Sequence, residues 1–290
     1  MKAQRFGSAH TEKKLKLVAH YLERFTTALK NQAFDTLYID AFAGTGAWTK
    51  QDSVGERQLG LLNVETVAEG SALRALRVDP PFDAYIFIEK SRKKSSALRE
   101  LSKEFPAHQD RIEVISEDAN TALREQCRRR DWRKSRAVVF LDPFGFQVEW
   151  NTVEVLAATR AVDLWYLVPT GIGINRQVTK DGRVLPGGGA HVDAMLGTTE
   201  WRSLLVKTET TAADLFGETE TRSVKAGGID AIADFVLHRL AGIFKGGVVK
   251  YGLPLGAQGR AMYTLVFACA NPAPKAHQLA LRLAGAVLKM

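Results

Sequence analysis

Apolar residues recur every three to four positions near the start of the chain, from Leu15 to Phe25. This spacing predicts an amphipathic helix over residues 12–30, with Thr11 as its N-cap. The charged side chains around this start are expected to lie in solvent: His10, Lys13 and Lys14. The alternative is that the start of this helix lies over a bound cofactor.

Short, continuous apolar runs follow, separated by helical patterns. Strands are predicted over 37–40, 84–89, 111–115, 137–142 and 163–168. Helices are predicted from Ser71, over 91–105, over 120–129 and over 229–244. Strands that alternate with helices indicate a parallel sheet with helices on both faces. Strands that are apolar throughout fit this arrangement, because both faces of such a sheet are buried.

The end of the chain has a different pattern. Strands over 247–255 and 262–268 are separated only by the short link Gly256–Arg260, which is too short for a helical crossover and predicts an antiparallel hairpin. We therefore expect one α/β domain over 1–290 with a mostly parallel, seven-stranded sheet. Its insertions lie at about 49–69 and 171–228. The second insertion contains Pro186-Gly187-Gly188-Gly189, which we interpret as a mobile loop, and is a candidate for substrate recognition.

An acidic residue stands at or just past the end of four successive strands: Asp40, Glu89, Asp118 and Asp142. In an open parallel sheet, ligands bind beyond the carboxyl ends of the strands. A single acid there is often a solvated cap. Four in succession favour a lined binding site.

The first of these acids opens the stretch "DAFAGTG", from Asp40 to Gly46. Its glycines allow a ligand to approach the backbone closely. We predict S-adenosylmethionine (SAM): Asp40 orients the amino end, Glu89 accepts the ribose hydroxyls and Asp118 accepts the adenine amino group. NAD is disfavoured because the third glycine of its fingerprint is missing. The predicted cofactor residues are Asp40, Phe42, Gly44, Gly46, Glu89, Lys90, Asp118 and Ala119.

The fourth acid belongs to "LDPFGF", in which proline and an aromatic residue follow Asp142. Asp142 and the carbonyl of Pro143 are predicted to accept hydrogen bonds from an amine, with Phe144 or Phe146 stacking on a base. The alternative is that Pro143 ends the strand and Phe144 packs in the core. The predicted catalytic residues are Asp142, Pro143 and Phe144, and the predicted substrate-binding residues are Phe146, Asn175, Arg176 and Arg92.

Composition and net charge limit the classes of molecule that this protein is expected to bind. The net charge of +8 favours a polyanion such as nucleic acid. The basic stretch Arg124–Arg136 precedes a strand, so we expect it at the amino edge of the sheet, away from the acids. The two cysteines and six histidines lack metal-ligand spacing, and no metal is predicted. No apolar run is long enough for a membrane span, and the start has no signal-like core, so a cytoplasmic protein is expected.

With the closing hairpin, this is the Rossmann-like architecture of class I methyltransferases. The sequence resembles one family in particular, the three-Cys-motif partner proteins. The resemblance covers nearly the whole chain and is carried, in order, by "HTEKKLKLVAHYLERF", "YIDAFAGTG", "GSALRAL", "FIEK", "LDPFG", "INR" and "MYTLVFA". It implies a bacterial protein with a methyltransferase-like fold and a separate three-cysteine protein as partner.

The "DPFG" tetrapeptide is also similar to a motif of tRNA guanine N2-methyltransferases, although base-amine enzymes more often have an aromatic residue where this chain has Gly145. We expect SAM-dependent methylation of an exocyclic amine in RNA or DNA. The alternatives are a non-catalytic adaptor that works with the three-cysteine protein, and a methyltransferase for a protein or a small molecule. The oligomeric state is left open.

Overall fold

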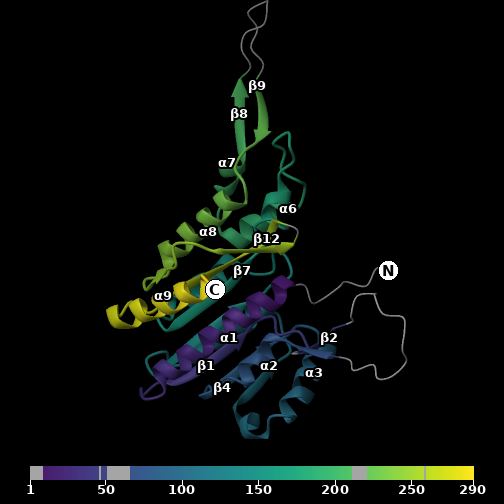
Figure 1. The fold of residues 1–290 in the computed structure, drawn as a ribbon. Helices are drawn as coiled ribbons and strands as arrows, with labels where there is room; N and C mark the ends of the chain where they lie inside the picture. The colour runs from purple at the N-terminus through teal and green to yellow at the C-terminus, as the bar shows by residue number, and fades with distance from the viewer. Residues whose placement is uncertain (1–8, 46, 51–65, 211–220, 258) are drawn as a thin grey trace, which may run out of the picture.

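The computed structural model describes residues 9–45, 47–50, 66–210, 221–257 and 259–290 (Figure 1). Its central sheet has eight strands in the order β10-β12-β7-β6-β1-β4-β5, with β11 also paired to β12. The strands are β1 (Asp35–Asp40), β4 (Ala84–Ile88), β5 (Ile112–Ile115), β6 (Ser135–Leu141), β7 (Val162–Val168), β10 (Gly247–Val248), β11 (Leu253–Ala257) and β12 (Arg260–Cys269).

Strands β1, β4, β5, β6 and β7 are parallel, and β12 runs antiparallel to β7, β10 and β11. The predicted fold class, a Rossmann-like parallel sheet closed by a C-terminal antiparallel hairpin, is confirmed. The number of strands was wrong, because the strand predicted over 247–255 is divided into β10 and β11. Between them the chain bends at Tyr251, whose hydroxyl donates a hydrogen bond to the carbonyl of Gly285 at 2.7 Å.

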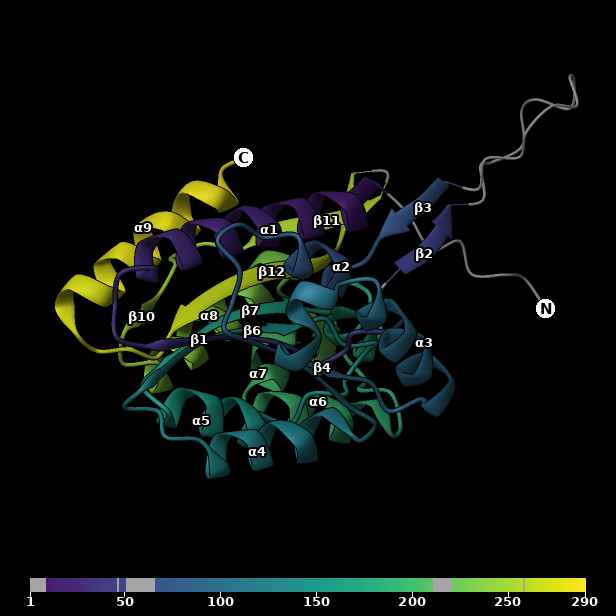
Figure 2. The ribbon, with the colours of Figure 1, turned by 90° about the horizontal axis from the view of Figure 1, so that it is seen from below.

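Helices cover both faces of the sheet, as predicted (Figure 2). One face is covered by α1 (Ala9–Leu29), α2 (Ser71–Leu76), α3 (Arg92–Lys103) and α9 (Pro274–Leu288). The other is covered by α4 (Ala119–Arg129), α5 (Trp150–Ala158), α6 (Gly188–Leu196), α7 (Trp201–Leu205) and α8 (Ile229–Ile243). Helices α5, α6, α7 and α9 were not predicted. Helix α1 begins at Ala9, so Thr11 lies inside its first turn and is not the N-cap.

Alternate residues of the strands pack on opposite faces, since successive side chains in a strand point in opposite directions. In β6, Ala137, Val139 and Leu141 pack under α4 and α5, whereas Val138 and Phe140 pack under α1. All five side chains are fully buried. This is why the strand is apolar throughout.

Both predicted insertions contain a small hairpin. Strands β2 (Ala47–Lys50) and β3 (Thr66–Glu69) pair antiparallel, and residues 51–65 lie outside the described part of the chain. Strands β8 (Val206–Thr210) and β9 (Thr221–Lys225) form an arm that projects from the body (Figure 1). Two short 3-10 helices, η1 (Pro106–Arg111) and η2 (Ile174–Gln177), complete the described elements.

The interpretation of 186–189 as a mobile loop was wrong. Gly187, with φ +76°, turns the chain, and α6 begins at Gly188. Only a glycine adopts such a positive φ without strain, so the run of glycines serves a sharp helix start rather than a long loop. Within the described residues, none of the helices has the length and apolar character that crossing a membrane requires.

Candidate active site

The strand order reverses between β1 and β6. From β1 the chain continues to β4 and β5 on one side, and then returns to β6 and β7 on the other. The carboxyl ends of the parallel strands meet at one edge, and this reversal is where open α/β sheets bind ligands. Asp40 ends β1 and Asp142 follows β6 directly, so these two predicted residues flank the reversal.

Asp40 is completely buried. Its Oδ1 accepts a hydrogen bond from the backbone N–H of Phe42 at 3.2 Å, while its Oδ2 has no hydrogen-bond partner among the described residues. Burial raises the pKa of Asp40 to about 7, against the smaller lowering effects of the Ser71 hydroxyl and the Phe42 amide. A buried carboxyl with an oxygen that has no hydrogen bond lowers the stability of the folded chain. Groups of this kind concentrate at functional sites.

Lys14 forms an ion pair with Asp142 Oδ2. The Lys14 side chain is only 10% exposed and that of Asp142 is 25% exposed. The expectation that Lys14 lies in solvent was therefore wrong. Helix α1 begins at the carboxyl edge of the sheet, and its first turns bring the ammonium to the carboxylate, 128 positions away in the sequence. The pair gives the site one buried cation close to two acids, because Lys14 also lowers the pKa of Asp40.

The glycine turn after β1 leaves open space. Gly44 has φ +62°, and a Cβ added there would meet no atom of the described residues within 4 Å. The conformation thus requires glycine, while the surroundings leave room for a ligand against the backbone. Phe42 is partly buried and packs against the core beneath the turn. Gly46, the other predicted glycine, lies outside the described residues.

The next two acids line the same edge. Glu89, just past β4, is half-buried, and its Oε1 accepts a hydrogen bond from the backbone N–H of Ser91 at 2.7 Å. Asp118 is the N-cap of α4, and its Oδ1 accepts from the backbone N–H of Asn120 at 3.0 Å. Lys90 is exposed and its Nζ lies 3.6 Å from Asp118 Oδ2. Ala119, the first residue of α4, is buried.

The loop after Asp142 presents an aromatic ring to solvent. Pro143 is buried, but Phe144 is 57% exposed and does not pack in the core. The ammonium of Lys94 lies 5.6 Å from the centre of the Phe144 ring. Phe146 is partly buried and lies roughly parallel to the ring of His191, with the two centres 6.4 Å apart. An exposed phenylalanine beside cations is the type of surface that stacks on a nucleobase.

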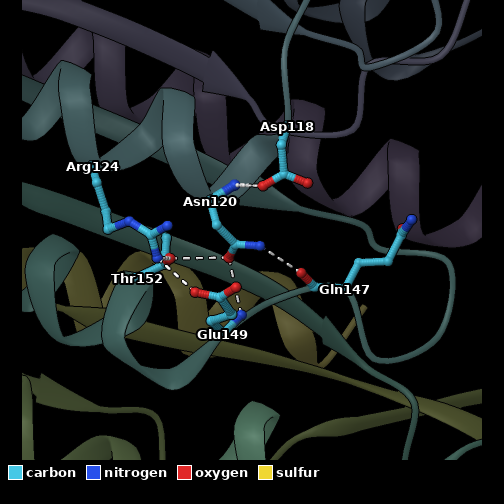
Figure 3. Close-up of polar contacts among 6 residues, drawn as sticks. All are labelled: Asp118, Asn120, Arg124, Gln147, Glu149 and Thr152. Atoms are coloured by element: carbon cyan, nitrogen blue, oxygen red, sulfur yellow. Dashed lines mark hydrogen bonds and ion pairs between the residues drawn. The ribbon is translucent and has the colours of Figure 1, made fainter. Parts of the chain in front are cut away.

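A buried polar network holds this loop in place (Figure 3). The side chain of Asn120 donates to the carbonyl of Gln147 at 2.8 Å and accepts from the backbone N–H of Glu149 and the hydroxyl of Thr152, both at 2.9 Å. Gln147 Oε1 in turn accepts from the backbone N–H of Phe144 at 2.8 Å. Asn120 therefore joins the start of α4, capped by Asp118, to the loop after Asp142.

The three remaining predicted residues lie around the same edge. Asn175 and Arg176 are in η2, just past the carboxyl end of β7, and Arg92 opens α3 after Glu89. Arg176 and Arg92 are exposed, whereas Asn175 Oδ1 is buried without a hydrogen-bond partner among the described residues. Lys225, on β9, joins this strand to η2 by donating hydrogen bonds to the carbonyls of Asn175 and Val178.

The described residues contain no group of three or more His, Cys, Asp or Glu side chains placed to hold a metal ion. Both cysteines, Cys127 and Cys269, are buried free thiols. Burial raises the pKa of Cys127 to about 12, so this thiol is not a nucleophile near neutral pH.

No protein-family model matches the sequence, and no curated protein matches it. Solved structures are similar at low identity. A protein from Legionella pneumophila described as DUF519 is 14% identical, with 82% of this chain and 94% of that chain covered and a TM-score of 0.42. The glycopeptide N-methyltransferase MtfA, complexed with sinefungin, is 14% identical, with 91% and 94% covered and a TM-score of 0.33.

A third similar structure is the magnesium protoporphyrin IX methyltransferase of Synechocystis with bound SAM. It is 10% identical, with 74% of this chain and 81% of that chain covered and a TM-score of 0.32. These similarities are weak. The function proposed below rests on the strand order of this chain and on its own site residues.

Proposed function

We propose that this protein is a SAM-dependent methyltransferase that transfers a methyl group to an exocyclic amine of a nucleic acid. The observation that carries the proposal is the pairing of a fully buried Asp40, with one unsatisfied oxygen, and an open glycine turn at Gly44. Both lie where the strand order reverses, which is the ligand-binding position of an open α/β sheet.

The residues present fit SAM. Gly44 leaves room for the cofactor against the backbone, and Asp40 offers its free oxygen toward the amino end. One oxygen of Glu89 accepts from Ser91, and the other, which has no hydrogen bond to the described residues, is the acceptor for the ribose hydroxyls. Asp118 keeps acceptor capacity at the adenine end because an ionised carboxylate has about four acceptor positions. When bound, the cofactor supplies a methyl group activated by the sulfonium charge.

Asp142 and the Pro143 carbonyl are the acceptors for the substrate amine. Hydrogen bonds from the two amine hydrogens would fix the plane of the amine and direct its lone pair toward the methyl group. Orientation of this kind supplies much of the rate in a transfer that needs no covalent intermediate. Lys14 forms an ion pair with Asp142 and so compensates the charge of a carboxylate that is largely withdrawn from water.

Three features support nucleic acid as the substrate class. Phe144 is exposed beside Asp142, Lys94 lies against its ring, and Arg92 is exposed at the start of the same helix as Lys94. The net charge of +8 adds a long-range attraction for polyanions. Phe144 stacks on the target base in this proposal, and the cations contact the flanking phosphates.

The ordered run of motifs also supports membership of the three-Cys-motif partner family. In that case a separate three-cysteine protein is the partner of this chain. The partner is a proposal that rests on the sequence resemblance alone.

Transfer of a labelled methyl group from SAM to total RNA or DNA tests the proposed function. Asp142→Ala should reduce transfer by roughly 100-fold or more, since the amine loses its orientation, while cofactor binding is retained. Asp110→Asn, an exposed carboxylate on η1, is the matched control. Undiminished transfer by Asp142→Ala would remove the acceptor role. Cofactor binding without transfer to any substrate, together with a stable complex with the three-cysteine protein, would favour the adaptor function.

A further inference from the structure

A cavity of about 410 Å³ lies at the amino edge of the sheet, opposite the candidate active site. It lies between the second half of α1 and the first half of α9, which are side by side, and it opens to solvent (Figure 2). Its floor is formed where β7 begins and β12 ends. The volume is in the range of small-molecule sites, about 300–1,000 Å³.

The walls of this cavity are mainly apolar. Phe25 and Leu29 contribute from α1, and Ala276, Leu279 and Leu283 contribute from α9. Apolar walls with a few convergent polar groups are typical of a binding pocket for a small organic molecule. This cavity has such polar groups at one end.

The first polar group is the guanidinium of Arg136, the last residue of the basic stretch Arg124–Arg136. Its Cζ lies 3.7 Å from the centre of the Phe34 ring. Its Nη1 donates hydrogen bonds to the carbonyls of Trp132 and Ser135, at 3.0 and 2.7 Å. The Nε–Nη2 edge has no acceptor among the described residues. This edge is the one that binds a carboxylate with two parallel hydrogen bonds.

The second polar group is Asp163, the only acidic residue among those described that line the cavity. Asp163 is buried, and its Oδ2 accepts a hydrogen bond from the Tyr21 hydroxyl at 2.6 Å. Burial raises the pKa of Asp163 to about 6. Asp163 and Arg136 attract each other electrostatically, but Asp163 forms no ion pair or hydrogen bond with Arg136 among the described residues, so the Nε–Nη2 edge remains available to a ligand. Lys275 adds a second cation to the lining.

We propose that this cavity is a second binding site, for a small carboxylic acid with an apolar body. The carboxylate pairs with the Nε–Nη2 edge of Arg136, and the apolar body occupies the space between α1 and α9. The two lining cations, Arg136 and Lys275, select an anion over a neutral or cationic molecule of the same shape. The inference does not depend on the proposed methyltransferase activity, because the two sites lie at opposite edges of the sheet.

Ligand-observed NMR on the purified chain tests the site with three acids, 3-phenylpropionate, indole-3-propionate and octanoate, each compared with its primary amide. At least one acid should bind, and should bind about tenfold or more tightly than its amide, as expected for a charge-assisted pair. Inorganic phosphate, which lacks the apolar body, should not displace it.

Two variants locate the binding. Arg136→Gln should reduce the affinity for the acid to that for the amide. Ala276→Trp should abolish binding of both the acid and the amide, because the larger side chain fills the cavity. This variant keeps Arg136, so it tests the site even if Arg136→Gln does not fold. Thermal unfolding checks that each variant is folded. Failure of all three acids to bind the folded wild-type chain would overturn the proposal, as would equal binding of acid and amide or binding unchanged in Ala276→Trp.

Discussion

Asp40 should make the protein less stable as the pH rises, and replacing it should remove this effect. The carboxyl is completely buried, and its pKa of about 7 lies well above the ordinary value of 3.8 for an aspartate. Between these values the folded state binds a proton that the unfolded state has lost. The free energy of unfolding therefore falls as the pH rises through this window, and the stability that protonated Asp40 contributes is lost above its folded pKa.

The magnitude follows from the two pKa values. Between about pH 5.5 and about pH 8.5 the unfolded chain releases no further proton from Asp40, whereas the folded chain becomes almost fully ionised, and the net cost is about 2 kcal/mol at about 1.4 kcal/mol per pKa unit. Asp40→Asn has the same shape and does not ionise. Its free energy of unfolding should therefore fall by about 2 kcal/mol less than that of the wild type over this range.

Urea unfolding of both proteins at the two pH values measures this difference. Other groups, including Asp163, titrate in both proteins and cancel in the comparison. Asp110→Asn, at an exposed position far from the site, should follow the wild type. If Asp40→Asn and the wild type lost stability in parallel, Asp40 would ionise at an ordinary pKa and the site would not be desolvated as described.

Three further predictions follow from the contacts of the site. Lys14→Met should lower the free energy of unfolding by about 3 kcal/mol near neutral pH, because it leaves the Asp142 carboxylate largely buried without its cation; Lys14→Arg should recover part of this in chemical denaturation. Asn120→Ala should speed amide hydrogen exchange in the loop 143–149, because Gln147 and Glu149 lose their partner, and equal exchange rates would exclude its positioning role. Phe144→Ala should change the free energy of unfolding by less than about 0.5 kcal/mol, since the ring is mostly exposed, yet weaken single-stranded nucleic acid binding by about 1–3 kcal/mol in fluorescence titration.

The parallel sheet could be predicted from the sequence because its strands are short, continuous apolar runs with an acid at or near the carboxyl end. Burial on both faces requires the first feature, and the second places the acids at the edge where open parallel sheets bind ligands. The antiparallel closure followed from the short link before β12. Helix α5 was not predicted because it is short and lies between two strands, β6 and β7, whose apolar runs dominate the pattern in this part of the sequence.

The polar contacts of the site could not be predicted in the same way. Lys14 looks like any charged residue in the first turns of a helix, and only the fold brings it to Asp142. Asn120 is a polar residue in a helix whose partners come from a loop that follows a different strand. Local sequence patterns predict secondary structure and burial. These contacts depend instead on which helix starts and loops meet at the carboxyl edge of the sheet.

Calorimetric titration of the cofactor-free chain with SAM tests the central claim most directly. The wild type should bind one equivalent, Asp142→Ala should still bind, and Asp40→Ala should lose binding because the amino end of the cofactor loses its acceptor. Binding by Asp40→Ala that equals the wild type would contradict the assigned site. No binding by the folded wild-type chain would contradict the claim that this edge of the sheet holds SAM.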